Sequence, residues 1–328
     1  MLKLTWRVAV AGAFAFTLGA LPASAQDQPI RIAFGDIPSV ESLHFLIAVE
    51  RAKEKGVRLE ISSVKSEDVA AQAVVGGQAD IGVGTPYAML QKVRAPMKLF
   101  YQLSTLRFYP IVNTEFYKSW KDLDGQEIAV NSRGSGTEAI MKLAADKHGI
   151  KYKTISYVPG SEVRAGALLQ GNIKASILDS TNRKIVMDRA PGKFAVLPLE
   201  GVSATDDALF ASPEFLEKNA QAVDTLVESL LQTVREISAR PEVAAELRTQ
   251  YKLLPDLPKQ LEADIVPYFK EAVEAKSLSV TGGGPDGAKI DLTFFNLAGQ
   301  ITGDPASLKV EDFWEFGPLN RAKAKLGQ

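Results

Sequence analysis

The chain has 328 residues and a nearly balanced charge, with 38 Lys and Arg against 39 Asp and Glu, and it contains no cysteine. The balance of charge argues against a nucleic-acid partner. The missing cysteines exclude disulfides, thiolate metal sites and cysteine nucleophiles. A chain of this length can form two domains that each bury a core.

The first 25 residues have the three parts of a secretory signal peptide. Lys3 and Arg7 give a basic start, residues 8–21 are apolar, and Ala23-Ser24-Ala25 is a small-residue cleavage motif. The apolar stretch is too short to span a bilayer comfortably, and its flanks match a signal peptide better than a buried helix. We therefore expect a signal peptide over residues 1–25, cleavage after Ala25 and a periplasmic mature protein.

Strands and helices alternate after the signal peptide. Runs rich in β-branched residues predict strands, and apolar residues at helical spacing predict helices between them. The first series of predicted strands covers residues 30–34, 57–64, 79–84, 97–103 and 107–113, with helices over 39–53, 66–77 and 86–93. A second series has strands over 127–130, 154–158 and 173–178, with helices over 137–148, 161–171 and 180–190.

The last third of the chain is mainly helical. We predict a strand over 207–212, helices over 215–238, 241–250 and 259–275, a flexible loop over 281–287, and C-terminal aromatic residues docked on a core. No low-complexity linker separates the two series, which favours lobes joined by crossing strands. The predicted fold class is α/β, with lobe 1 over 27–112 plus 204–328 and lobe 2 over 113–203.

A glycine turn in the middle of the chain matches a dinucleotide-binding fingerprint. Gly134, Gly136 and Ala139 have the spacing G-x-G-x-x-A between a predicted strand and a predicted helix. A dinucleotide site should open the first βαβ unit and be followed by an acidic residue at the tip of the next strand. Neither condition is met here, so we do not expect a nucleotide cofactor.

Other catalytic and metal-binding patterns are incomplete. The two histidines, His44 and His148, lack the spacing and number that a zinc site needs. The S-x-x-K match at 62–65 has no companion motifs, and a turn explains Asp122 and Asp124 better than a calcium loop. We predict no catalytic residue, no metal and no cofactor. His44 lies early in the first helix, where it could reach a cleft or belong to a helix face.

The loops between strands and helices share a common chemistry. Small and hydroxyl residues precede helices in the loops 35–39, 84–86, 133–137, 159–162 and 178–183. Free backbone N–H groups at helix N-termini favour negative charge, and such loops meet at the carboxyl edge of an α/β sheet. Simple N-capping explains any single loop equally well, but both halves of the chain carry the pattern.

Two segments of the chain are specific enough to indicate a family: "GGQADIGVG" at 76–84 and "DLDGQEIAV" at 122–130, the second followed by a glycine–hydroxyl loop. With these segments the chain resembles the periplasmic substrate-binding proteins of ABC importers, and most closely the group for alkanesulfonates, nitrate, taurine and thiamine precursors. The resemblance implies a type II periplasmic-binding-protein fold with two α/β lobes around a ligand cleft. At 178–180 the family often has an aromatic–acidic–proline sequence, so no particular sulfonate is implied.

The resemblance also implies a function and its partners. We expect a monomeric solute-binding protein that delivers a small organic solute, anionic or zwitterionic, to an inner-membrane ABC permease. Two alternatives remain open. The "RGSGT" segment at 133–137 is similar to binding proteins of TAXI-type TRAP transporters, and the same fold occurs in an enzyme of thiamine-precursor synthesis.

We expect the ligand to lie between the loops of the two lobes. Hydroxyls and the helix N-terminus at 135–137 would hold a polar, anionic group, and glycine at 136 would let it approach the backbone. Acidic residues would orient donors or an amine, and aromatic residues would pack on apolar parts. The predicted ligand-binding residues are Asp36, Ser39, Thr85, Tyr87, Phe108, Ser135, Gly136, Thr137, Asp179 and Arg183.

Overall fold

A computed structural model describes residues 28–327, so the predicted signal peptide and its cleavage site lie outside the described residues. The first of its two five-stranded sheets has the strand order β2-β1-β3-β10-β4. In this sheet β1 is parallel to β2 and β3, whereas β10 is antiparallel to β3 and β4. The strands are β1 (Ile30–Phe34), β2 (Leu59–Ser63), β3 (Ile81–Gly84), β4 (Lys98–Gln102) and β10 (Ala208–Ala211).

The second sheet has the strand order β7-β6-β8-β5-β9 and the same mixed character. Its strands are β5 (Tyr109–Asn113), β6 (Glu127–Val130), β7 (Thr154–Tyr157), β8 (Ala175–Leu178) and β9 (Phe194–Val196). Strand β5 pairs antiparallel with β8 and β9. The predicted boundary at residue 112 falls inside this strand, so by sheet pairing the chain changes sheets before Tyr109.

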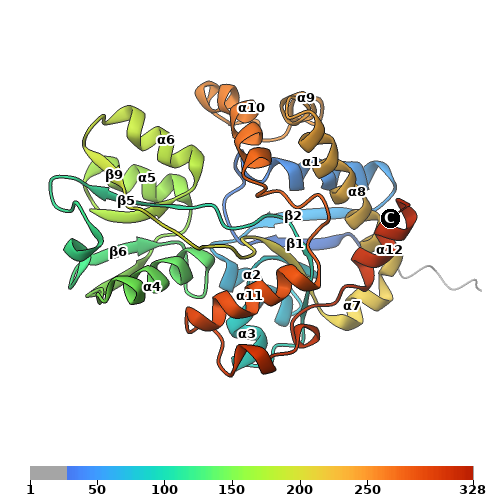
Figure 1. The fold of residues 1–328 in the computed structure, drawn as a ribbon. Helices are drawn as coiled ribbons and strands as arrows, with labels where there is room; N and C mark the ends of the chain where they lie inside the picture. Colours follow the sequence, from blue (N-terminus) through green and yellow to red (C-terminus); the bar gives the residue numbers. More distant parts are fainter. Residues whose placement is uncertain (1–27, 328) are drawn as a thin grey trace, which may run out of the picture.

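Each sheet is covered by helices and forms one lobe (Figure 1). Lobe 2 carries α4 (Gly136–His148), α5 (Ser161–Gln170) and α6 (Ser180–Arg189), and the short helix η1 (Trp120–Leu123) precedes β6. Lobe 1 carries α1 (Leu43–Glu54), α2 (Glu67–Val75), α3 (Tyr87–Lys92), α7 (Pro213–Lys218), α8 (Ala220–Ala239), α9 (Val243–Gln250), α10 (Lys259–Glu274), α11 (Pro285–Leu297), η2 (Pro305–Ser307), η3 (Val310–Asp312) and α12 (Gly317–Lys325).

Two parts of the helical region differ from the sequence prediction. The helix expected over 215–238 is divided at Asn219, whose backbone leaves the helical region and whose side-chain amide donates to the Phe215 carbonyl. Helix α11 begins at Pro285, inside the segment expected to be a flexible loop. Proline is favourable at the first position of a helix. The glycine-rich stretch before Pro285 therefore leads directly into the start of α11.

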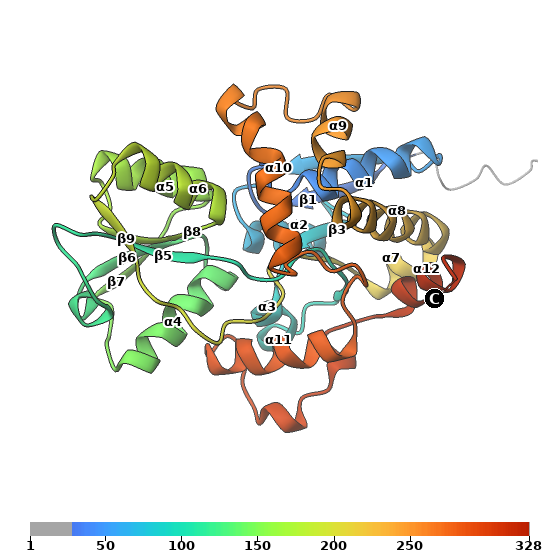
Figure 2. The ribbon, with the colours of Figure 1, turned by 45° about the horizontal axis from the view of Figure 1, so that its top comes forward.

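Two antiparallel segments connect the lobes. The Leu106 amide donates to the Ala204 carbonyl and the Asp206 amide to the Ser104 carbonyl, both at 2.9 Å. A third segment, which follows α10, joins them where Thr105 donates to the Ser277 carbonyl. These three segments lie next to one another between the lobes. Helix α10 lies on the side of lobe 1 that faces lobe 2 (Figure 2).

The C-terminal aromatic residues dock on lobe 1 as expected. Phe313 and Trp314 are buried, and Trp314 forms a bridge with Leu99 of β4.

Across residues 28–327, no helix combines the length and apolar content that crossing a membrane requires.

Candidate ligand-binding cleft

Two neighbouring cavities lie between the lobes, and both are bordered by Asp36, Glu41, Asp206 and Asp207. We call the first the His44 cavity; its empty volume is about 640 Å³, and its border includes Arg107, Ser180 and Tyr268. The second is the Arg164 cavity, with an empty volume of about 450 Å³ and a border that includes Glu67, Phe108, Asn131, Gly136 and Thr137.

The topology of lobe 1 brings these carboxylates together. Asp36 follows β1, and Asp206 and Asp207 precede β10. Since β10 lies in the same sheet as β1 but runs in the opposite direction, its beginning lies at the edge where β1 ends. Glu67 opens α2, directly after the parallel strand β2 has reached that edge. Four carboxylates from three separate parts of the sequence therefore converge at one sheet edge.

The carboxylates are half-buried and close to one another, which disfavours their charged forms. Burial raises the pKa of Glu67 to about 8, and the charge of Asp207 contributes. Burial raises the pKa of Asp207 to about 7, with a further contribution from Asp36. The pKa values of Glu41 and Asp206 are raised well above the usual range for the same two reasons. The cleft of the free protein thus resists carrying its full negative charge.

Arg164 of α5 is the one buried cation on the border of the Arg164 cavity, and sequence reasoning missed it. Only 1% of it is exposed. Its Nε donates to the Ile177 carbonyl at 3.1 Å, and its Nη1 donates to the Val158 carbonyl at 2.9 Å and to Asn131 Oδ1 at 3.1 Å. These contacts fix the guanidinium beside Asp36, whose charge counteracts the effect of burial on the pKa of Arg164.

His44 borders the cavity that carries its name and belongs to the buried face of α1. The residue is 4% exposed. Its Nδ1 lies 2.9 Å from the Glu41 carbonyl and Nε2 has no hydrogen-bond partner. Burial lowers the pKa of His44 to about 4, and the Glu41 and Leu103 carbonyls oppose this shift, so the imidazole is neutral at pH 7. With the proton on Nδ1, which donates to the Glu41 carbonyl, Nε2 presents a lone pair.

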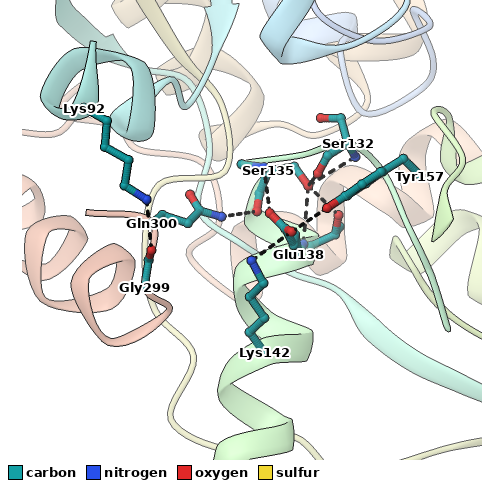
Figure 3. A network of polar contacts seen from close by, with 10 residues as sticks. Lys92, Ser132, Ser135, Glu138, Lys142, Tyr157, Gly299 and Gln300 are labelled. Carbon is teal, nitrogen blue, oxygen red and sulfur yellow. Dashed lines mark hydrogen bonds and ion pairs between the residues drawn. The ribbon is translucent and has the colours of Figure 1, made fainter. Parts of the chain in front are cut away.

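The turn that precedes α4 has the geometry of a helix cap (Figure 3). Ser135 Oγ accepts from the Glu138 amide at 3.3 Å and donates to the Ser132 carbonyl at 2.8 Å. Thr137 Oγ1 accepts from the Asn131 amide at 3.0 Å. Glu138 accepts from the Gly134 amide at 2.7 Å. A carboxylate of the chain itself therefore occupies part of the position where an anionic ligand was expected.

Gly136 and Thr137 nevertheless border the Arg164 cavity. A Cβ atom at position 136 would lie 2.4 Å from Leu106 Cδ2. Since Leu106 belongs to a segment that connects the lobes, a side chain at position 136 would disturb that segment first. Packing between the lobes thus explains why position 136 is a glycine. We had expected the close approach of a ligand to be the reason.

The structure separates the other predicted residues into two groups. Asp36, Ser39 and Phe108 border the cavities. Thr85 lies behind them: it is buried, and its amide and hydroxyl both donate to Glu67 Oε2, at 2.9 and 3.0 Å. Asp179 caps α6 by accepting from the Asn182 amide and side chain, both at 2.7 Å.

Tyr87 belongs to the core of lobe 1, contrary to the prediction that it packs on the ligand. It is completely buried and stacks on Phe295 at 4.5 Å between ring centroids. Its hydroxyl donates to Asp291 at 2.6 Å and accepts from Trp314 Nε1 at 2.8 Å. The Tyr87 hydroxyl therefore makes both of its hydrogen bonds inside lobe 1, away from the cleft.

Arg183 takes part in a contact between the lobes. Its guanidinium lies 4.1 Å from the centre of the Tyr109 ring and 3.9 Å from Glu271 of α10. Glu271 also pairs with Arg107, and Lys184 lies 3.5 Å from Asp264 of the same helix. Helices α6 and α10 thus meet through opposite charges at the side of the cleft.

The sequence profile of the family described as "NMT1/THI5 like" matches residues 45–244. The match covers more than half of the chain, so the protein belongs to the NMT1/THI5-like family. No curated protein sequence matches the chain significantly.

Solved structures of periplasmic binding proteins share the fold. The alkanesulfonate-binding protein SsuA from Xanthomonas axonopodis pv. citri, bound to MOPS, superimposes with a TM-score of 0.64 at 15% identity, over 89% of this chain and 99% of that one. The nitrate-binding protein NrtA from Synechocystis PCC 6803 gives 0.68 at 12% identity, over 91% and 89%. A protein from Bordetella bronchiseptica RB50 gives 0.73 at 21% identity, over 92% and 98%.

These matches confirm the predicted fold class. The chain has the type II periplasmic-binding-protein fold, an α/β fold with two lobes around a cleft.

In the described part of the chain, no group of three or more His, Asp or Glu side chains is arranged to hold a metal ion.

Proposed function

We propose that this protein is the periplasmic solute-binding component of an ABC importer and carries a small organic solute to an inner-membrane permease. The observation that carries the proposal is the cleft itself. Charged and polar side chains from both lobes and from the connecting segments border the same two cavities. A solute bound there touches both lobes, so its binding energy favours the closed arrangement, which a permease can recognise.

The proposal includes export and removal of the N-terminal segment. The motive is the basic start, apolar stretch and small-residue motif of residues 1–25. N-terminal sequencing of the protein from a periplasmic fraction should begin at Gln26. Recovery of the folded protein with Met1 intact would refute export by this route.

The central experiment is identification of the solute. The full mature protein is purified without unfolding, and mass spectrometry is applied to the small molecules that it releases on denaturation. The released solute is then titrated into solute-free protein by calorimetry. We expect one organic solute at close to one equivalent, returned unchanged after incubation. Chemical turnover of that solute would favour the enzyme alternative, and uptake dependent on an ion gradient would favour a TRAP partner.

A further inference from the structure

We propose that the solute carries a protonated amine or a related organic N–H cation, and that this group binds among Asp36, Asp206 and Asp207 where the two cavities meet. The inference rests on the proposed solute-binding function and specifies the chemical class of the solute. It differs from the anionic group that the turn before α4 suggested.

The first observation is the excess of unpaired hydrogen-bond acceptors. Within residues 28–327, the carboxylates Asp36, Glu41, Glu67, Asp206 and Asp207 form no ion pair with a lysine or arginine. Their few contacts are with neutral donors, for example the Ile37 amide at 2.7 Å from Asp36 and the Ser104 hydroxyl at 3.5 Å from Asp206. These carboxylates are half-buried, and although Arg164 lies beside Asp36, no cation of the described chain pairs with them directly, so their oxygens keep acceptor capacity for a ligand.

The second, independent observation is His44. It is more than nine-tenths buried, borders the same cavity, and leaves Nε2 without a partner. With the proton on Nδ1, which donates to the Glu41 carbonyl, Nε2 is left as an acceptor. The cavity therefore offers carboxylate oxygens and the His44 nitrogen as acceptors, which require a donor from the ligand, and it also offers Arg107 Nη1 as an unpartnered donor.

The kind of cation follows from the arrangement of these acceptors. The carboxylate oxygens and His44 Nε2 are separate acceptors, and an organic cation with several N–H groups can donate to each of them. Arg164 offers the opposite chemistry on the border of the Arg164 cavity, because Nη2 makes no hydrogen bond with the described residues while Nε and Nη1 do. A solute that carries both a cationic nitrogen and an oxygen acceptor matches both kinds of group.

The experiment uses one carbon skeleton with different end groups. Solute-free, full-length mature protein is titrated by calorimetry with 1,6-diaminohexane, 6-aminohexanoate, adipate and 1,6-hexanediol, and with nitrate and hexane-1-sulfonate as further anions. We expect the amine-bearing probes to bind at least about tenfold more tightly than the diol, because each charge-assisted hydrogen bond contributes about 1.5–3 kcal/mol. We expect no binding of the three anions.

Variants connect the binding to the cluster. Asp206→Asn and Asp36→Asn each remove one charge and should weaken binding of the amine probes about 10- to 100-fold. The matched control is Asp286→Asn, because Asp286 is fully exposed on α11 and should leave the affinity unchanged. Two carboxylate variants are made so that the binding test can still be carried out with one of them if the other does not unfold cooperatively.

The outcomes separate this inference from the proposed function. Binding of adipate, nitrate or hexane-1-sulfonate without binding of the amines, or release of a solute that has no basic nitrogen, overturns the inference and leaves the proposed function intact. Release of an amine whose affinity falls in Asp206→Asn supports both. A protein that releases no solute and binds none of the six probes overturns the proposed function and the inference with it.

Discussion

Tyr87 shows at the scale of one residue how a loop position can be structural. It follows the loop 84–86, as a ligand contact would, yet its hydroxyl joins Asp291 to Trp314 inside lobe 1. Tyr87→Phe should lower the free energy of unfolding by about 1–3 kcal/mol, because Trp314 Nε1 and Asp291 each lose a partner. Urea denaturation measures this loss, and calorimetry should give an unchanged solute affinity.

Phe108 provides the comparison for Tyr87, because it borders the Arg164 cavity. Phe108→Ala should weaken solute binding more than it affects stability. A Tyr87→Phe protein with normal stability and reduced affinity would show that our assignment of the two aromatic residues is reversed.

Glu67 makes the stability of the solute-free protein depend on pH. Its pKa is raised from 4.5 to about 8 by burial, so the folded protein binds this proton more tightly than the unfolded chain does. The stability that this tighter proton binding gives the folded protein is fully present below pH 4.5. It is lost as the pH rises towards 8. The Tm should therefore fall between pH 5 and pH 8, by roughly 2–4 °C for each kcal/mol lost.

The Glu67→Gln variant isolates this effect. A glutamine oxygen can still accept from the Thr85 amide and hydroxyl, but it does not titrate, so the fall in Tm should become smaller. Glu214→Gln is the control, because Glu214 is exposed and pairs with Lys218 on the surface. Equal pH profiles for Glu67→Gln and the unaltered protein would contradict the assignment.

At the scale of elements, α11 is held to the rest of lobe 1 by one buried carboxylate. Asp291 is completely buried, and it accepts from the Thr205 amide and hydroxyl, both at 2.7 Å, as well as from Tyr87. Thr205 lies in a segment that connects the lobes, and Tyr87 begins α3. Asp291 therefore fixes three elements relative to one another.

Replacing Asp291 tests this role. Asp291→Ala leaves three buried donors without an acceptor and should cost about 3 kcal/mol or more in the free energy of unfolding. Asp286→Asn, on the exposed side of the same helix, should change it by less than about 0.5 kcal/mol. A small effect of Asp291→Ala in urea denaturation would mean that packing alone positions α11.

At the scale of the whole molecule, a contact outside the cavities joins the two lobes. Gln300, which follows α11 in lobe 1, donates from Nε2 to the Ser135 carbonyl of lobe 2 at 2.9 Å (Figure 3). The contact is buried. It links the turn before α4 to the opposite lobe, so it stabilises the arrangement of the lobes seen in this structure, and the proposed closure around a solute would depend on it.

Gln300→Ala should therefore weaken solute binding about 2- to 10-fold, which corresponds to one hydrogen bond of about 0.5–1.5 kcal/mol, mainly through faster dissociation. Stopped-flow dissociation and calorimetry measure the change, and small-angle scattering should show a more open protein at partial saturation. Lys92→Ala is a matched control, because Lys92 donates to the Gly299 carbonyl within lobe 1. Equal dissociation rates for the two variants would refute the role of Gln300.

The sequence by itself determined the local elements. The alternation of apolar residues and the positions of glycine and proline were sufficient to predict every strand of the two sheets except β9 (Phe194–Val196), because these signals act over a few residues. They were insufficient where a tertiary contact decides the outcome, as for β5, which pairs within the second sheet. Two other differences are local: Asn219 divides one predicted helix, and α11 begins at a proline inside a predicted loop.

The candidate site was the part that only the tertiary structure decided. Sequence reasoning placed Asp36, Ser39, Phe108, Gly136 and Thr137 at the cleft, since they follow strands and precede helices. It missed the residues that give the cleft its charge, which are Glu41, Glu67, Arg164, Asp206 and Asp207. The order in which strands join a sheet and the burial of each side chain depend on long-range packing, so neither the acidic cluster nor its raised pKa values can be seen in a local pattern.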